Sequence, residues 1–253
     1  MQVSALGTVA LARLEWEEDM RTAAPRVCLL NVDESGSMSK QMRQNLELYR
    51  FLHRMRSALF DAVIVHGFGY DSHYEIFATP EAMPLFDGIE HPNLTRNEVG
   101  GSWSLHGQVK QHLAQRKADG TTCPRTHHHF LGALSDALER RSSAPIELVV
   151  GNSSDGGFDR SAPQAEIREE MLRLTSLCRC SLIANLLVGA KGSPEALHFF
   201  TGDANAFHAS ILLSTMASEH AGIHDIEEVM RSRDADFARR FGIDWQSPSL
   251  IWH

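Results

Sequence analysis

Short apolar runs separated by helical patterns constrain the fold of this chain more than any other feature. Four of these runs occupy residues 27–32, 62–68, 146–150 and 180–188. Each has the length of a strand, and near-continuous apolar strands are typical of a parallel sheet that helices cover on both faces. The alternation therefore predicts an α/β fold with a parallel sheet and right-handed crossovers.

Amphipathic helices are predicted between and after these runs, because apolar residues recur there at intervals of three and four. The helical patterns cover residues 39–60, 103–113, 126–141, 161–178 and 194–200. The helix of 161–178 is expected to begin with a capping box, in which Ser161 is the N-cap and Gln164 follows three residues later.

The other segments are predicted from local composition. Residues 73–77 are expected to form a hairpin with the strand at 62–68, whereas 79–102 is rich in Pro, Asn and Gly and is predicted to be a loop. Further elements are predicted nearer the two ends: an edge strand within 3–16, a brief strand at 206–208, and helices at 211–218 and 226–241.

Length and charge restrict the class of protein. The 253 residues suit one domain, 1–253, with a core at about 26–208 and a helical segment at about 209–253. A net charge of −8 gives a nucleic-acid partner little support. No run is long and apolar enough to cross a bilayer, and the amino terminus has no signal-segment pattern. We therefore expect no membrane partner and a cytoplasmic location, while the oligomeric state stays open.

Three oxygen-bearing side chains alternate on the loop that follows the first buried run. Asp33, Ser35 and Ser37 have the spacing that lets a carboxylate and two hydroxyls converge on one hard cation. Mg²⁺ prefers oxygen ligands in a near-octahedral shell and keeps some waters. The alternative is an ordinary helix start, with Ser37 or Ser39 as N-cap and Gly36 as turn residue.

The same loop resembles the metal-ion-dependent adhesion site (MIDAS) of von Willebrand factor A domains, whose first loop reads Asp-x-Ser-x-Ser at the end of the first core strand. That family supplies a threonine from a second loop and an aspartate from a third, and Gly-Thr-Thr at 120–122 and Ser-Asp-Gly-Gly at 154–157 match in order. The resemblance implies five metal ligands: Asp33, Ser35, Ser37, Thr121 and Asp155. Thr122 stays open in place of Thr121, and Asp155 binds directly or through a water.

The resemblance also implies a fold and a function. The fold is a three-layer Rossmann-like α/β domain with a mostly parallel central sheet and one antiparallel edge strand. The function is a divalent-cation-dependent protein-binding module, scaffold or regulatory, that captures an acidic side chain of a protein partner through Mg²⁺, or through Mn²⁺ or Ca²⁺. Intracellular members of the family often work within multi-protein systems.

Two other classes of function stay open: a metal-dependent hydrolase, such as a phosphatase, and a structural subunit with a vestigial site. We expect no enzymatic activity, because the first loop lacks a second carboxylate to act as nucleophile or acid and Ser35 has no identifiable base nearby. Glu34 adjoins Ser35 but lies at the intervening position, so its side chain should point elsewhere.

Two groups of polar residues fall inside or beside apolar elements. Asn31, Asn152 and Asn185 interrupt strands and form either a polar layer that orients the metal loops or three separately satisfied amides. Three adjacent histidines at 127–129 cannot converge on one metal unaided, since neighbours on a helix point about 100° apart. Of these, His127 alone falls on the apolar face and could reach the threonine loop.

Overall fold

The computed structural model describes residues 24–40, 42–55, 60–69, 72–118, 124–140, 146–159, 161–188, 199–200 and 207–213. The strand predicted within 3–16, the helix at 226–241 and the two threonines at 121 and 122 lie outside these residues. No helix among the described residues is both long and apolar enough to cross a membrane.

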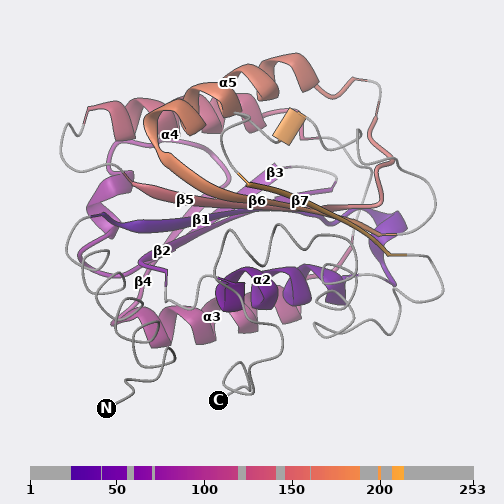
Figure 1. Cartoon of the computed structure of the whole chain (residues 1–253), viewed down its shortest axis with the longest axis horizontal. Coiled ribbons are helices and arrows are strands. Elements are labelled where there is room, and N and C mark those ends of the chain that lie inside the picture. The colour runs from indigo at the N-terminus through magenta and orange to yellow at the C-terminus, as the bar shows by residue number, and fades with distance from the viewer. Residues whose placement is uncertain are drawn as a thin grey trace, which may run out of the picture.

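Seven described strands form one sheet in the order β4-β3-β2-β1-β5-β6-β7 (Figure 1). Their bounds are β1 (Arg26–Asp33), β2 (Ala62–Phe68), β3 (Ser72–Ala78), β4 (Leu94–Glu98), β5 (Glu147–Ser154), β6 (Arg179–Val188) and β7 (Phe207–Leu213). Strands β2 and β3 pair antiparallel, and every other neighbouring pair is parallel. The predicted fold class is confirmed.

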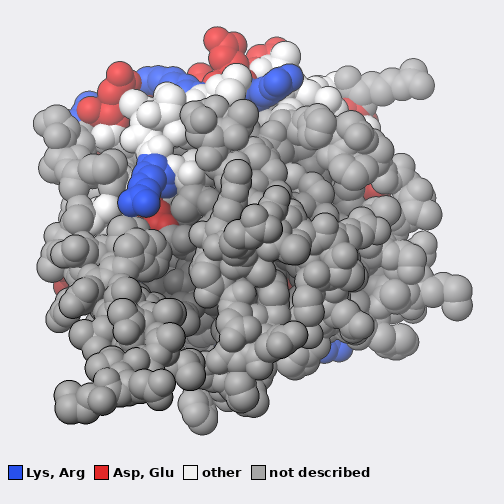
Figure 2. All heavy atoms as spheres, in the orientation of Figure 1, with Lys and Arg blue, Asp and Glu red and all other residues white. Residues whose placement is uncertain are grey.

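Helices cover both faces of the sheet and complete the three layers (Figure 1). Helices α2 (Arg43–Met55) and α3 (Ser102–Gln115) lie on one face, and α4 (His127–Glu139) and α5 (Gln164–Leu177) lie on the other. Acidic and basic side chains are interspersed along the top of the view in Figure 2, where α5 lies in Figure 1. In this region Arg173 of α5 forms ion pairs with Asp136 and Glu139 of α4.

The two faces of β1 belong to two separate apolar cores. Val27 and Leu29 pack with residues of α4 and α5, whereas Cys28, Leu30 and Val32 pack with residues of α2 and α3. Both sets are buried, which explains why the strand reads as a continuous apolar run. Burying one such side chain contributes about 1.5–3 kcal/mol, so the central strands are anchored from both sides.

The segment predicted as a loop contains two regular elements. A short 3-10 helix, η2 (Met83–Phe86), precedes β4, and β4 pairs with β3 to become the outer strand of the sheet. The prediction of loop over 79–102 was therefore wrong at these residues. The side chains of β4 are exposed or half-buried and show no apolar alternation. This edge strand is therefore defined by its backbone pairing with β3.

Two predicted boundaries also differ from the structure. Residues 211–213 belong to β7 and not to a helix, because they continue the parallel pairing with β6. Helix α5 begins at Gln164 with Pro163 at the N-cap, so the predicted capping box is absent. Ser161 instead donates its hydroxyl and its N–H to the carboxylate of Asp159, which forms a local turn before the helix.

Candidate metal centre

The candidate site lies where two central strands end side by side. Strands β1 and β5 are parallel neighbours, and their carboxyl ends carry Asp33 and Ser154. From this pair the sheet continues to β2 on one side and to β6 on the other. Open α/β sheets bind ligands at such a topological switch point, so the architecture favours a site here.

The first loop turns sharply after Asp33, whose side chain is buried. Its Oδ1 accepts the N–H of Ser35 at 2.9 Å, and the N–H of Met38 then bonds the carbonyl of Ser35 at 2.9 Å. The short helix η1 (Gly36–Met38) follows, and α2 begins only at Arg43. Ser37 and Ser39 therefore do not cap α2, and the helix-start interpretation of this loop was wrong.

The third loop is bonded to the first by a serine that the sequence analysis did not single out. Ser154 donates its hydroxyl to Asp33 Oδ2 at 2.6 Å and accepts the N–H of Gly156 at 3.0 Å. Asp155 follows, with its Oδ1 held by the N–H of Gly157 at 2.9 Å. Gly156 has a positive φ of 77°, which glycine adopts without strain. The sequence signal for Ser154 is its position two residues beyond Asn152, on the same face of β5.

Negative charge at the site lacks a basic partner among the described residues. Burial raises the pKa of the Asp33 carboxyl to about 6; hydrogen bonds from Ser154 and Ser35 oppose this shift, and the nearby Asp155 carboxylate adds to it. Within the described ranges, neither Asp33 nor Asp155 forms an ion pair with Lys, Arg or His. A divalent cation would supply the missing compensation.

The oxygen atoms present fit such a cation. The hydroxyl oxygens of Ser35 and Ser37 lie 3.0 Å apart. Two neighbouring ligands of an octahedral Mg²⁺ at the usual distance of about 2.1 Å are also separated by about 3.0 Å. The Asp33 oxygens accept the Ser35 N–H and the Ser154 hydroxyl, and a carboxylate has about four acceptor positions, so capacity for a cation remains. Of the five predicted ligands, the structure brings together Asp33, Ser35, Ser37 and Asp155, and Thr121 lies outside the described residues.

The candidate site is not a cluster of His, Cys, Asp and Glu side chains alone. Across the part of the chain that the structure describes, no cluster of three or more His, Cys, Asp and Glu side chains could hold a metal. A cation here would depend on serine hydroxyls beside the two carboxylates, which suits a hard ion such as Mg²⁺ or Mn²⁺.

No protein-family model matches this sequence, and no curated protein is significantly similar to it. Solved structures of several other proteins resemble the chain in fold. A von Willebrand factor type A structure from Catenulispora acidiphila shares 14% identity over 83% of this chain and 43% of its own, with a TM-score of 0.47. The conserved hypothetical protein BatB from Bacteroides thetaiotaomicron shares 11% over 82% and 99%, with a TM-score of 0.43. The manganese-loaded TRAP protein of Plasmodium vivax shares 13% over 82% and 72%, with a TM-score of 0.42.

The topology decides the fold. A mostly parallel sheet has one antiparallel pair, and the Asp-x-Ser-x-Ser loop follows its first core strand. The chain has a von Willebrand factor A-type fold. The chain spans less than half of the Catenulispora acidiphila structure.

The Glu34 side chain is directed to Arg116 and not to Ser35, as predicted. Arg116, just after α3, donates from Nε to Glu34 Oε1 at 2.8 Å and from Nη2 to Oε2 at 2.5 Å. His73 also contacts Arg116, and both His73 and Glu34 lie over Gly67, where a Cβ atom would overlap the His73 ring. We name Glu34, Arg116 and His73 the ionic clamp.

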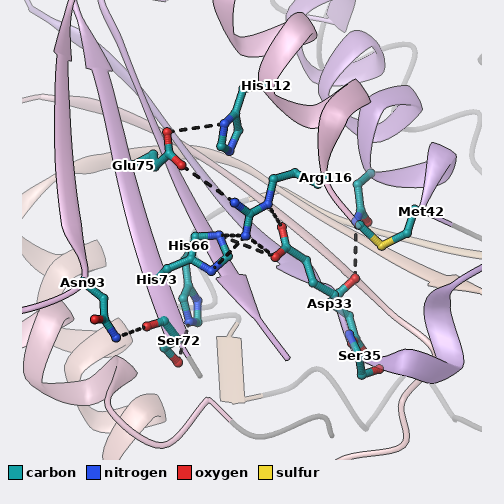
Figure 3. Close-up of polar contacts among 12 residues, drawn as sticks. Asp33, Ser35, Met42, His66, Ser72, His73, Glu75, Asn93, His112 and Arg116 are labelled. Carbon is teal, nitrogen blue, oxygen red and sulfur yellow. Dashed lines mark hydrogen bonds and ion pairs between the residues drawn. The ribbon is translucent and has the colours of Figure 1, made fainter. Parts of the chain in front are cut away.

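Two further residues extend the clamp toward α3. Glu75 of β3 lies 3.8 Å from Arg116 Nη1 and 3.3 Å from His112 Nδ1 of α3 (Figure 3). Burial, together with the positive charge of Arg116, lowers the pKa of His73 to about 3 and that of His112 to about 4. Both imidazoles are therefore neutral at physiological pH, and Arg116 is the cation of the cluster.

The predicted polar layer is present on the opposite face of the sheet. Asn31 donates to Asn152 at 2.8 Å, and Asn152 donates to Asn185 at 2.7 Å, so the three amides bond to one another. His66 extends the layer, with its Nδ1 2.9 Å from Asn31 Oδ1. The alternative of three separately satisfied amides was wrong. We name Asn31, Asn152 and Asn185 the amide ladder.

The three adjacent histidines have different environments. His127 is buried, stacks on His66 with ring centroids 3.7 Å apart, and places its Nδ1 3.4 Å from the Tyr74 hydroxyl. His128 is half-buried and His129 is exposed. The structure therefore connects His127 to the polar layer beneath the site.

Proposed function

We propose that this domain is a divalent-cation-dependent protein-binding module that captures a carboxylate of a partner protein. The observation that carries this proposal is the buried carboxylate of Asp33, which has no ion-pair partner among the described residues and lies beside two serine hydroxyls 3.0 Å apart. Ser37 is exposed at this loop, so a partner can approach from solvent. The module would serve a scaffold or regulatory role.

The residues of the site have separate roles in this proposal. Asp33 and Asp155 supply negative charge, and Ser35, Ser37 and Thr121 supply neutral oxygens. A bound Mg²⁺, Mn²⁺ or Ca²⁺ offers an acidic partner side chain an open coordination place. Because only two ligands carry charge, a third carboxylate from the partner adds attraction without overfilling the site with negative charge.

The chain's own residues support binding over catalysis. Glu34 is the carboxylate adjacent to Ser35 in sequence. Both of its carboxylate oxygens accept hydrogen bonds from Arg116, so it is not positioned to take a proton from that serine. Ser35 Oγ instead contacts Ser37 Oγ. A nucleophilic serine needs a base within hydrogen-bond reach, and the carboxylate that Ser35 does contact is that of Asp33, which this proposal assigns to the cation.

We place this module in the cytoplasm, within a multi-protein assembly. Among the described cysteines, Cys28 and Cys178 are free thiols, which suits a reducing compartment. Asn152 begins an Asn-x-Ser glycosylation pattern, but its side chain is buried and hydrogen-bonded to Asn185. We therefore expect no glycan on Asn152.

Calorimetric titration of chelator-stripped protein with Mg²⁺ and Mn²⁺ tests the proposal. We expect one site in the wild type, no binding by Asp33→Ala, and at least about tenfold weaker binding by Ser37→Ala, because each loses a ligand. Ser39→Ala is the matched control, since this serine is exposed in the same loop but is not a predicted ligand.

The outcomes separate the three classes of function. Binding by the wild type and Ser39→Ala but not by Asp33→Ala supports the cation module. Equal binding by all variants contradicts it. Cation-dependent turnover of a phosphoester panel, lost in Asp33→Ala, would favour a hydrolase, and folded wild type without any cation affinity would favour a structural subunit.

A further inference from the structure

A continuous chain of side-chain hydrogen bonds crosses the sheet directly beneath the candidate cation site. Besides the two bonds of the amide ladder, His66 Nδ1 lies 2.9 Å from Asn31 Oδ1 and His66 Nε2 lies 3.3 Å from Ser72 Oγ. The chain therefore links residues of β3, β2, β1, β5 and β6. All five side chains are buried.

Strand register aligns the members of this row. Asn31 pairs with His66 on one side and with Asn152 on the other, and Asn152 pairs with Asn185. The equivalent row two residues earlier on the same face is wholly apolar. That row consists of Ile64, Leu29, Val150 and Ile183, which are paired in the same way. The fold thus accepts apolar side chains one row away, and the polar row calls for another explanation.

The hydrogen bonds of the row have one direction. Because Asn31 uses its amide nitrogen to donate to Asn152, its oxygen is free to accept, and His66 must donate from Nδ1. Burial, with His127 close by, lowers the pKa of His66, so its ring is neutral and Nε2 accepts from the Ser72 hydroxyl. Each member is satisfied only while its neighbours keep their orientation.

The row adjoins the two loops that carry charge. Two residues beyond Asn31 in β1 is Asp33, and two residues beyond Asn152 in β5 is Ser154; these two are bonded at 2.6 Å on the same face. The strand ends that present Asp33 and Asp155 are therefore tied together twice, once by the Ser154 bond and once by the amide ladder below it.

We propose that Asn152 is a positioning residue for the cation site: through its bonds to Asn31 and Asn185 it fixes the ends of β1 and β5, and so the relative placement of Asp33 and Asp155. This inference rests on the proposed function. It adds a residue that is not itself a cation ligand but holds two of the ligands in place. Residues that orient metal ligands affect metal affinity by about 10- to 100-fold when replaced.

The test compares two substitutions in the same strand and on the same face. Asn152→Ala removes the middle of the amide ladder, whereas Val150→Ala makes a cavity in the apolar row and leaves every ladder bond in place. The measurements are Mn²⁺ affinity by calorimetry and unfolding by denaturant for both variants. We expect about tenfold or more weaker Mn²⁺ binding by Asn152→Ala, and binding by Val150→Ala within about twofold of wild type despite its own loss of stability.

Asn185→Ala is the second variant, used if Asn152→Ala does not fold. It leaves a single donor of Asn152 without its partner, so the fold is less disturbed, and we expect a smaller but measurable loss of Mn²⁺ affinity relative to Val150→Ala. Nitrogen NMR of the wild type should find the His66 proton on Nδ1. A proton on Nε2 would overturn the direction assigned to the row.

The wild type alone decides the proposed function, so the two failures are distinct. If the wild type binds no Mn²⁺, the proposed function and the positioning role both fall. If the wild type binds but the ladder variants bind as well as Val150→Ala, only the positioning role is overturned. Weaker binding by the ladder variants than by Val150→Ala supports it.

Discussion

Two polar clusters lie on opposite faces of the same sheet and are built on different chemistry. The amide ladder, on the α4–α5 face, is composed of neutral groups that are fully or almost fully buried. The ionic clamp, on the α2–α3 face, joins Glu34 to Arg116, whose side chain is 26% exposed. One cluster is sealed in the core, and the other reaches water.

The difference follows from the cost of burying charge. An amide that bonds to two neighbours can be enclosed without an unmet donor or acceptor, but an ion loses its hydration and must be paired or left partly wet. Arg116 meets both conditions, because Glu34 binds it bidentately and part of its side chain remains in solvent. Beside these clusters, Asp33 is buried without a described cationic partner, which singles it out as the group that awaits a ligand.

Acidification should produce the largest effect, and it should act through buried histidines on both faces, since the pKa values of His73 and His112 beside the clamp are lowered as well. Burial lowers the pKa of His66 and His127 well below 6.5, so the unfolded chain takes up protons that the folded chain does not. Stability is then present above pH 6.5 and is lost as the pH falls, by up to about 1.4 kcal/mol per pH unit for each histidine. The raised pKa of Asp33 has the opposite sign between its unfolded value and about 6.

A His127→Phe variant isolates one of these histidines. Denaturant unfolding between pH 7 and pH 5 should show that the variant loses less stability than the wild type on acidification, by up to about 1.4 kcal/mol per pH unit. Parallel curves for the two proteins would mean that His127 takes up its proton in the fold, and the neutral character assigned to this face would be incorrect.

Gly67→Ala should damage the clamp face without touching the ladder. The added methyl would overlap the ring of His73 and the carboxyl carbon of Glu34, so both side chains must shift from the positions in which they contact Arg116. Overpacking of this kind costs about 1–3 kcal/mol. Gly107→Ala in α3 is the matched control, because nothing lies within 4 Å of its added Cβ.

For the control we expect stabilisation of about 0.5–1 kcal/mol, since glycine is unfavourable inside a helix. Thermal or denaturant unfolding of both variants gives the comparison. Equal stability of Gly67→Ala and wild type would show that the clamp rearranges without loss of stability. It would contradict the claim that the clamp residues pack closely over Gly67.

Arg116→Gln should have a smaller effect that depends on salt. It removes charged hydrogen bonds to Glu34, but Arg116 is partly exposed, so we expect a loss of about 1 kcal/mol. Screening should reduce this loss as ionic strength rises. Arg173→Gln, which breaks only surface ion pairs of α4 and α5, should cause no measurable change. Matching losses in the two variants would contradict the distinction between a clamp and a surface pair.

The sequence was most informative where burial and periodicity act together. The run at 62–68 became β2 with the same bounds, because a strand covered on both faces must be apolar throughout. Strand β4 could not be predicted, since backbone bonds at the sheet edge define it and its side chains leave no pattern. The ladder was predictable as a layer because three amides interrupt apolar strands, a costly substitution unless they are bonded.

The candidate site was predictable only in part. Asp33, Ser35 and Ser37 are close in sequence, so their convergence follows from one turn. Ser154 and Arg116 were missed because their partners lie 121 and 82 residues away, and only the fold brings them together. For the ionic clamp, the available sequence signal was Gly67 inside the apolar run of β2. A glycine there leaves room for the side chains of His73 and Glu34.

The most direct test of the central claim is water-proton relaxation of the wild type with Mn²⁺, followed by titration with a short peptide that contains glutamate. Bound Mn²⁺ that keeps water should enhance relaxation, and a carboxylate that replaces that water should lower the enhancement, while Asp33→Ala should give neither change. The account predicts this rise and fall. An equal enhancement in Asp33→Ala would contradict binding of the cation at this site. A glutamine peptide serves as the control, and if the glutamate peptide changes the enhancement no more than the glutamine peptide does, capture of a carboxylate is contradicted.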